Sequence, residues 1–157
     1  MIVIGPTPDF VFRAVMRYAF ASILATALLH VPIAGAGNLV VIVNPASGIT
    51  QLTRNQVIDI FLGRYRKLPS GEIAIPIDLL VNTPERKQFY LLLVGRDLTQ
   101  MSSYWARLVF SGQAVPPFPV PDARTALDLV AANPSAIAYV DGASVNSRVR
   151  VVLELNP

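Results

Sequence analysis

Cysteine is absent from this 157-residue chain, and histidine occurs once, as His30. Without cysteine there is neither a disulfide framework nor a thiol nucleophile. His30 lies in the N-terminal apolar segment, so residues 37–157 have no histidine for a catalytic triad or for a His/Cys zinc site. Asp59, Asp78 and Asp97 show neither the spacing of a catalytic carboxylate pair nor a calcium-loop pattern. The sequence therefore predicts a protein that is not an enzyme and that uses no metal or cofactor.

Charge of either sign is also scarce. The chain has 13 basic and 10 acidic residues, which give a formal net charge of +3. The basic residues are scattered, apart from the cluster Arg64-Tyr65-Arg66-Lys67. Binding to nucleic-acid phosphates needs a basic stripe or patch. We therefore expect no nucleic-acid partner.

The longest apolar segment, YAFASILATALLHVPIAGAG, is short for a membrane span and is interrupted by proline and glycine. Arg13 and Arg17 precede its apolar core, and the small-residue pattern Ala34-Gly35-Ala36 ends it. These are the three regions of a secretory signal. We expect residues 1–36 to be a signal peptide, with Met16 as a hypothetical true start, and the mature protein to be periplasmic or secreted. An uncleaved N-terminal anchor is the alternative.

Residues 37–157 are enough for a single domain. Two capping boxes, Thr53 to Gln56 and Asp97 to Gln100, predict where helices begin. Glycines follow the expected helix ends. The hydrophobic periodicity predicts strands at 38–44, 72–80, 135–140 and 148–155, and helices at 54–62, 84–94, 97–110 and 123–132. This order predicts an α/β domain with a mixed sheet and flanking helices.

Prolines and aromatic residues add three details. Pro76, inside the second expected strand, indicates a position near a sheet edge or a bulge. The segment PPFPVP, residues 116–121, cannot be helical and is expected to be a rigid surface crossing. Trp105 and Phe110 are expected to be core residues of the helix at 97–110.

One candidate binding site is the helix start after the second strand, in the stretch LLVNTPERKQFY. The first-turn amides and the helix dipole attract anions. Asn82 and Thr83 could hydrogen-bond such an anion, and Arg86 could contact it in bidentate fashion. However, Pro84 removes one amide and Glu85 adds a negative charge. A helix that is merely capped by Asn82 or Thr83, with no ligand, is the competing interpretation.

Two further candidates are weaker. The loop NPASGIT after the first strand offers Ser47, Gly48 and Thr50, although a polar turn at a strand end is common without function. Arg64 follows the expected C-terminus of a helix at Gly63, where a cation often only complements the helix dipole.

Three segments in order resemble a known family. LTRNQVIDIFLGR, YWARLVFSG and ANPSAIAYVDGASV resemble segments of the periplasmic phosphate-binding-protein family, the solute receptors of phosphate ABC transporters. The resemblance covers the chain from Val40 to about Leu153. It implies a type II periplasmic-binding-protein fold, in which two lobes close on an oxyanion held by backbone amides, hydroxyls and an arginine. This chain is long enough for one such lobe. In the family's phosphate motif an arginine precedes Ser-Gly-Thr at a helix start; here Thr83 matches, and Asp78 stands near the position of the arginine.

The resemblance implies an exported, non-catalytic module that binds a phosphate-like oxyanion and works with a membrane transporter. The alternative hypothesis is an envelope interaction or sensory accessory protein that kept the lobe and lost the ligand. A membrane sensor and a second copy of the chain are further candidate partners.

Overall fold

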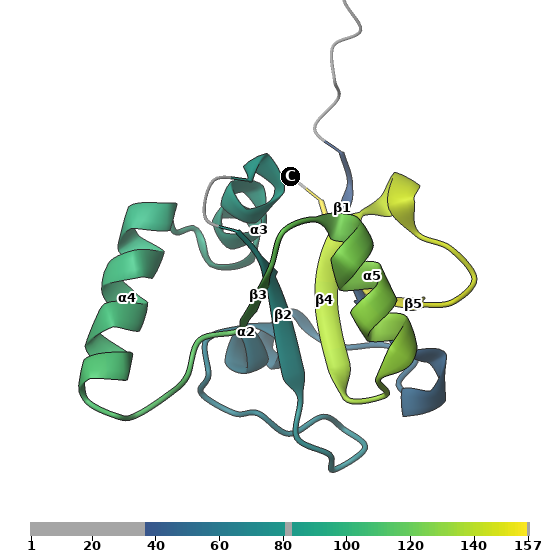
Figure 1. The fold of residues 1–157 in the computed structure, drawn as a ribbon, viewed down its shortest axis with the longest axis horizontal. Coiled ribbons are helices and arrows are strands. Elements are labelled where there is room, and N and C mark those ends of the chain that lie inside the picture. Colours follow the sequence, from purple (N-terminus) through teal and green to yellow (C-terminus); the bar gives the residue numbers. More distant parts are fainter. Residues whose placement is uncertain (1–36, 81–82, 157) are drawn as a thin grey trace, which may run out of the picture. The chain divides into compact units, whose positions relative to one another are not determined.

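The computed structural model describes residues 37–80 and 83–156, which form a five-stranded mixed sheet flanked by helices (Figure 1). The expected signal peptide and Asn82 lie outside these residues. The elements are β1 (Leu39–Val43), the 3-10 helix η1 (Pro45–Ser47), α2 (Arg54–Phe61), β2 (Ile75–Leu79), α3 (Pro84–Val94), α4 (Leu98–Phe110), β3 (Phe118–Val120), α5 (Ala123–Ala132), β4 (Ala136–Asp141), the 3-10 helix η2 (Gly142–Ser144) and β5 (Arg150–Leu155).

The helix starts follow the local capping chemistry. Thr53 and Asp97 each accept a hydrogen bond from the backbone of the third helical residue, and a glutamine closes the capping box in both cases. Asp122 caps α5 through the backbone N–H of Thr125 at 2.8 Å. These contacts need no tertiary structure, which explains why the sequence predicts the helices within a few residues.

The sheet has the strand order β3-β2-β4-β1-β5. The strands β3, β2 and β4 run parallel, whereas β1 runs antiparallel to both of its neighbours, β4 and β5. All five residues of β1 are buried, as expected for a central strand. A bulge between Val41 and Ile42 shifts the pairing of β1 with β5.

The prediction for Pro76 is confirmed, whereas that for residues 116–121 is wrong in part. Within the proline segment, Phe118–Val120 form the edge strand β3, parallel to β2. Prolines are tolerated at a sheet edge because an outward-facing amide needs no ladder partner. Pairing between β2 and β3 begins at Ile77, so Pro76 lies just before that ladder and only one strand inside the edge.

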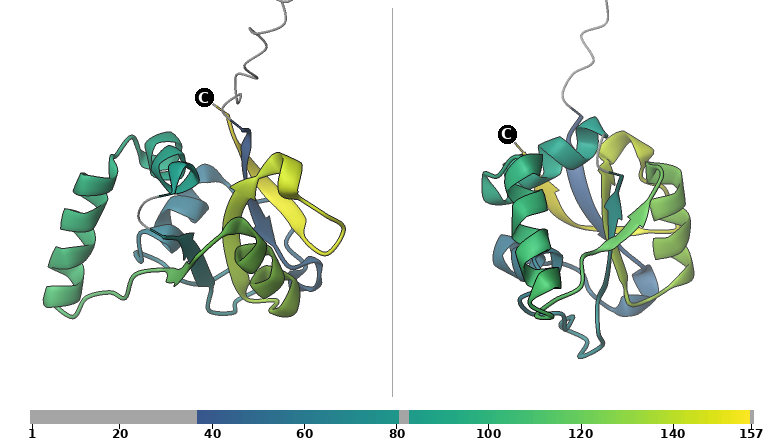
Figure 2. Two further views of the ribbon diagram at one scale, coloured as in Figure 1. Left: turned by 45° about the horizontal axis from the view of Figure 1, so that its top comes forward. Right: turned by 60° about the vertical axis from the view of Figure 1, so that its left-hand side comes forward.

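The helices cover both faces of the sheet. α5 packs on one face, and α2, α3 and α4 lie on the other (Figure 2). An aromatic cluster joins α2 and α3 to β4 on that second face. The rings of Phe89 and Tyr139 stack with centroids 3.7 Å apart, and Phe61 meets Phe89 edge-on at 4.8 Å. Such ring pairs add stabilisation beyond the apolar area they bury.

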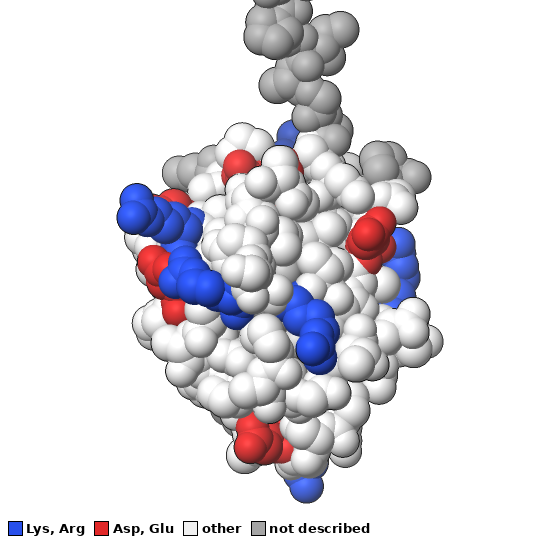
Figure 3. Space-filling view, turned by 90° about the vertical axis from the view of Figure 1, so that its right-hand side faces the viewer, with Lys and Arg blue, Asp and Glu red and all other residues white. Residues whose placement is uncertain are grey.

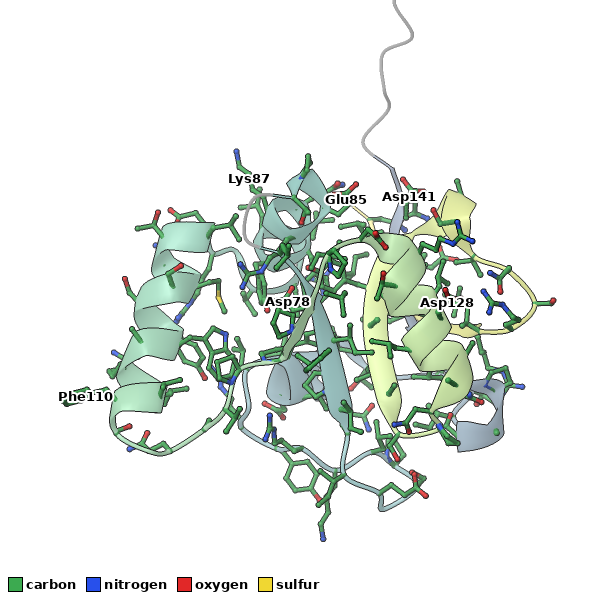
Figure 4. The ribbon with its side chains drawn as sticks, viewed as in Figure 1. Asp78, Glu85, Lys87, Phe110, Asp128 and Asp141 are labelled. Atoms are coloured by element: carbon green, nitrogen blue, oxygen red, sulfur yellow. The ribbon has the colours of Figure 1, made fainter. Side chains whose placement is uncertain are left out.

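The helix α4 is the outermost element on the second face (Figure 1). Trp105 is buried as expected, and its neighbour Tyr104 donates a hydrogen bond to the Leu62 carbonyl at 2.7 Å. Phe110 contradicts the prediction of a core position, because it is 96% exposed at the end of α4 and points away from the body (Figure 4). The hydrophobic periodicity places Phe110 on the apolar face of the helix, but α4 extends past the surface that could cover Phe110.

Gly63 gives a prediction about how the end of α2 packs against α4. Its backbone is left-handed, with φ of 68°, and a Cβ added there would lie 3.1 Å from Trp105 and 3.2 Å from Ala114. Gly95 has nearly the same φ, 67°, but open space around it. Gly95→Ala should therefore cost only the backbone term, about 1–2 kcal/mol of unfolding free energy. Gly63→Ala should cost more, because Trp105 must also move; equal losses in urea unfolding would contradict this packing.

Candidate functional site

The α3 start and the strand that precedes it meet at a buried carboxylate, Asp78. Its residue surface is 3% exposed, at the end of an otherwise apolar strand. Arg86 Nε donates to one carboxylate oxygen at 2.9 Å, and the Tyr90 hydroxyl donates to the same oxygen at 2.8 Å. The Tyr139 hydroxyl donates to the other oxygen at 2.5 Å. We call these four residues the Asp78 cluster; Figure 4 shows Asp78 within the body of the molecule.

The Asp78 cluster follows from element geometry. Arg86 and Tyr90 are four residues apart on α3, so they lie on one face of that helix. Tyr139 reaches the same carboxylate from β4, and its hydroxyl oxygen also accepts from the Leu79 backbone N–H at 3.3 Å. Three elements are thereby tied to one buried charge, which is consistent with the rule that buried charges are paired and hydrogen-bonded.

The cluster also shifts ionisation equilibria. Burial alone would lower the pKa of Arg86, but the charge and hydrogen bond of Asp78 outweigh it, so the pKa of Arg86 is raised. Burial raises the pKa of Tyr139 far above its ordinary value of about 10, and the nearby Asp78 charge raises it further. The same two causes raise the pKa of Tyr90. Near neutral pH the cluster therefore holds a guanidinium and two neutral phenols.

The α3 start itself is partly consistent with anion binding. Thr83 occupies the N-cap position, but its side chain makes no capping hydrogen bond and instead donates to the Leu80 carbonyl at 3.0 Å. Among the described residues, no side chain caps the Glu85 and Arg86 amides. The side chain of Thr83 thus does not cap α3, whereas capping or ligand binding by Asn82 stays a prediction.

Ser47 and Gly48 do not join this site. Val43 pairs with Ile137 of β4, which pairs in turn with Pro76, so the end of β1 and the start of β2 lie at the same end of the strands, with β4 between them. The loop after β1 is thus at one end of the strands, and α3 begins at the opposite end.

The loop after β1 instead has structural contacts. Asn44 donates to the carbonyls of Val130 and Ala131, at 3.0 and 2.8 Å, and so holds the C-terminal end of α5. The Asn44 carboxamide oxygen accepts from the Ala46 amide, and Gly48 ends η1 in a left-handed conformation. This loop is a fixed turn between a strand and a helix end.

Arg64 is exposed and lies 4.0 Å from Asp59, a surface ion pair of little energetic weight. Its neighbour Arg66 lies instead on a groove that Asp78 and Arg86 also line. Of the basic cluster 64–67, the sequence analysis favours Arg64, whereas Arg66 is the arginine that lines this groove. No local pattern distinguishes the two, because only the path of the chain after Gly63 decides which side chain turns inward.

The sequence marks Asp78 only as a departure from the family motif. Two signals could have revealed the cluster: a carboxylate inside an apolar strand needs a partner, and Arg86 and Tyr90 share a helix face. The identity of Tyr139 as a third partner depends on parallel pairing between strands about 60 residues apart, as the separation of Asp78 and Tyr139 shows, and no local pattern encodes it.

The described residues contain no group of three or more His, Cys, Asp and Glu side chains suited to a metal ion. None of the described helices has the length and hydropathy of a membrane span. The face shown in Figure 3 is mostly uncharged, with a short row of basic side chains and acidic ones nearby. That face has no broad basic surface for nucleic acid.

Comparison with solved structures decides the fold. The chain aligns with an ABC-type phosphate transport receptor from Vibrio cholerae with a TM-score of 0.59 at 19% identity, over 74% of this chain and 45% of the receptor. The fold resembles one lobe of a phosphate receptor. A protein described as a phosphate ABC transporter substrate-binding protein with bound phosphate, from Clostridium perfringens, gives 0.59 at 16% identity over 74% and 44%. PstS from Borrelia burgdorferi gives 0.56 at 14% over 74% and 46%.

The chain thus spans less than half the length of these receptors. No protein-family model matches the sequence, and no curated protein matches it. The resemblance expected from the three sequence segments is confirmed, as is the expected α/β lobe with a mixed sheet and flanking helices.

The Asp78 cluster predicts a large stability difference between ion pairs. Asp78→Asn leaves Arg86, whose side chain is 13% exposed, without a counter-charge, and should lower the unfolding free energy by about 3–5 kcal/mol. The matched control Asp59→Asn breaks an exposed pair and should change it by at most about 1 kcal/mol. Equal effects in chemical denaturation would show that the Asp78 pair is not a structural anchor.

The raised tyrosine pKa values predict alkaline sensitivity. Unfolded tyrosines ionise above about pH 10, whereas Tyr90 and Tyr139 stay protonated in the folded state. Their contribution to the unfolding free energy is complete below about pH 10. It is lost as the pH rises above that value, at up to about 1.4 kcal/mol per pH unit for each group. Stability of Tyr139→Phe should be lower at neutral pH but fall less steeply from about pH 10 to 11.5. Tyr65→Phe, at a site that is 61% exposed, is the control and should keep the wild-type slope.

Proposed function

We propose that this protein is an exported, non-catalytic module that binds a phosphate-type oxyanion at the N-terminal turn of α3. The observation that carries the proposal is the α3 start at the carboxyl end of the parallel strand β2, in a fold resembling phosphate receptors. Ligands in open α/β sheets bind outside the carboxyl ends of the strands. The uncapped amides of Glu85 and Arg86 and the dipole of the 11-residue helix α3 favour an anion there.

Arg86 supports this role through its orientation. Asp78 uses only the Nε of Arg86, so the two terminal nitrogens are not engaged by that carboxylate. Asp78 holds the guanidinium in place, and the terminal nitrogens then offer a fork to an oxyanion. Thr83 supplies a hydroxyl from the same turn once it releases the Leu80 carbonyl, because a hydroxyl has only one proton to donate. Asn82 is the third expected ligand. Ser47, Gly48 and Arg64 are not part of this proposed site.

The localisation and partners of the module follow as proposals from the same resemblance. The similar protein from Vibrio cholerae is a transport receptor, which supports a membrane transporter as the partner of this chain. A periplasmic or secreted location agrees with the signal peptide expected in residues 1–36. Homodimerisation and a sensor partner remain predictions.

The second candidate function is an interaction or sensory accessory protein without a ligand. The Asp78 cluster favours it, because a carboxylate near the anion seat neutralises Arg86 and contributes a repelling charge. Such a protein would keep the lobe for its surfaces alone.

Titration of the purified protein with phosphate, sulfate and molybdate separates the two candidates. A ligand at about 100 times its dissociation constant should raise the unfolding free energy by about 2.7 kcal/mol. Thr83→Val removes the hydroxyl, and Arg86→Lys keeps the charge beside Asp78 but loses the fork; both should weaken calorimetric binding by about tenfold.

The matched control is Ser47→Ala, at the opposite end of the strands, and this variant should bind the anion as the wild type does. Absence of heat and of any melting shift at millimolar anion would reject oxyanion binding and leave the accessory function. Unchanged affinity in both α3 variants would show that the anion binds at another site.

A further inference from the structure

A second, apolar feature lies beside the Asp78 cluster. It is a groove of about 620 Å³, and we call it the Arg66 groove. Its apolar lining includes Ile73, Ile75, Pro76, Pro117, Phe118 and Pro119. Small-molecule sites typically have about 300–1,000 Å³ and mostly apolar walls with a few polar groups. The groove has the size and lining for an organic molecule, well beyond the needs of a bare phosphate.

The topology explains why the groove exists. Asp78 pairs with Pro119 across the parallel ladder, and the prolines next to them present rings without long side chains. The groove is lined by residues of β2 and of the edge strand β3. α4 does not fill this space, because it lies at the outer edge of the molecule and reaches β3 only through the segment 111–117 (Figure 1).

Charge in the groove is positive overall. Its charged lining residues are Arg66, Arg86 and Asp78, so one positive charge is in excess. Asp78 pairs with Arg86 at 2.9 Å, whereas Arg66 forms no ion pair among the described residues. The excess charge belongs to Arg66.

Arg66 is held in place but not satisfied. Its Nη2 donates to the Val115 carbonyl at 2.9 Å, and its own carbonyl accepts from the Ala74 amide. Its Nε is buried and has no hydrogen-bond partner within residues 37–80 and 83–156. A buried N–H without an acceptor is costly and uncommon, so the surroundings satisfy this guanidinium only in part. A carboxylate is the group that matches the fork of a guanidinium.

We propose that the Arg66 groove binds an organic monocarboxylate, with the carboxylate on Arg66 and an apolar body on the proline-rich face of β2 and β3. The charge of one anion matches the single unpaired arginine. The apolar walls exclude a free inorganic ion as the preferred occupant, since they contribute only when apolar surface is buried against them. Arg86 of the proposed oxyanion seat also lines the groove, but this proposal rests on Arg66 and does not depend on that seat.

Calorimetry of the whole protein with 4-phenylbutyrate tests the proposal. It should bind one molecule per chain, and both 4-phenylbutanol, which lacks the charge, and acetate, which lacks the body, should bind at least about tenfold more weakly. Arg66→Gln should weaken 4-phenylbutyrate binding by a similar factor. Ile73→Ser, at a wall position that is 67% exposed and not needed for the core, should weaken it less. Arg124→Gln, an exposed arginine on α5, is the matched control and should bind as the wild type does.

Three binding results would overturn the proposal. They are undiminished binding in both Arg66→Gln and Ile73→Ser, equal affinity for 4-phenylbutanol, and no binding of 4-phenylbutyrate at millimolar concentration. A dimer that Ile73→Ser dissociates and that excludes 4-phenylbutyrate would assign the groove to a second copy and also overturn it. Inorganic phosphate added in parallel keeps the two sites distinguishable: its binding reports on Thr83 and Arg86, and should neither displace 4-phenylbutyrate nor respond to Arg66→Gln.

Discussion

A single buried carboxylate, Asp78, constrains how this domain is assembled. Its charge is removed from water at the end of a strand, and such a charge is tolerated only when donors surround it. Those donors come from α3, through Arg86 and Tyr90, and from β4, through Tyr139. The rotation of α3 about its axis is thereby set, since Arg86 and Tyr90 must face the sheet together. The same rotation places Phe89 against Tyr139 in the aromatic stack.

The parts of the fold that can be predicted from the sequence are those with local causes. Capping boxes at Thr53 and Asp97 and glycines after the helices act within a few residues, so four helices and their order follow from sequence alone. The strand β3 escapes prediction because a proline-rich segment has no intrinsic strand preference. It becomes a strand only because β2 offers an open ladder, as in the hydrogen bond from the Leu80 amide to the Val120 carbonyl. Phe110 is misplaced by sequence reasoning because periodicity identifies an apolar face without showing how far a neighbour covers it.

The candidate site likewise has parts that can be predicted from the sequence and parts that cannot. The α3 start is predictable, since a strand, a cap and a first-turn proline are local signals. The partner of Arg86 is not, because Asp78 is brought to it by folding. Ser47 and Gly48 follow the end of β1, as Thr83 follows the end of β2. The antiparallel direction of β1 nevertheless places Ser47 and Gly48 at the opposite end of the strands from Thr83. Strand direction is a tertiary property, and a short apolar run such as Leu39–Val43 does not encode it.

Arg66 and Arg86 line one groove, yet their surroundings give them different capacities. Arg86 already has a carboxylate, and its raised pKa reflects that interaction. An incoming anion must therefore share this guanidinium with Asp78 and accept the repulsion between two negative charges. Arg66 has only a backbone carbonyl, which satisfies one donor and cancels no charge. Because net attraction for an anion depends on the charge left uncompensated, Arg66 is the stronger electrostatic anchor of the two. Arg86 can compete only where the α3 amides add to it, and this difference separates an organic carboxylate in the groove from an inorganic oxyanion at the helix start.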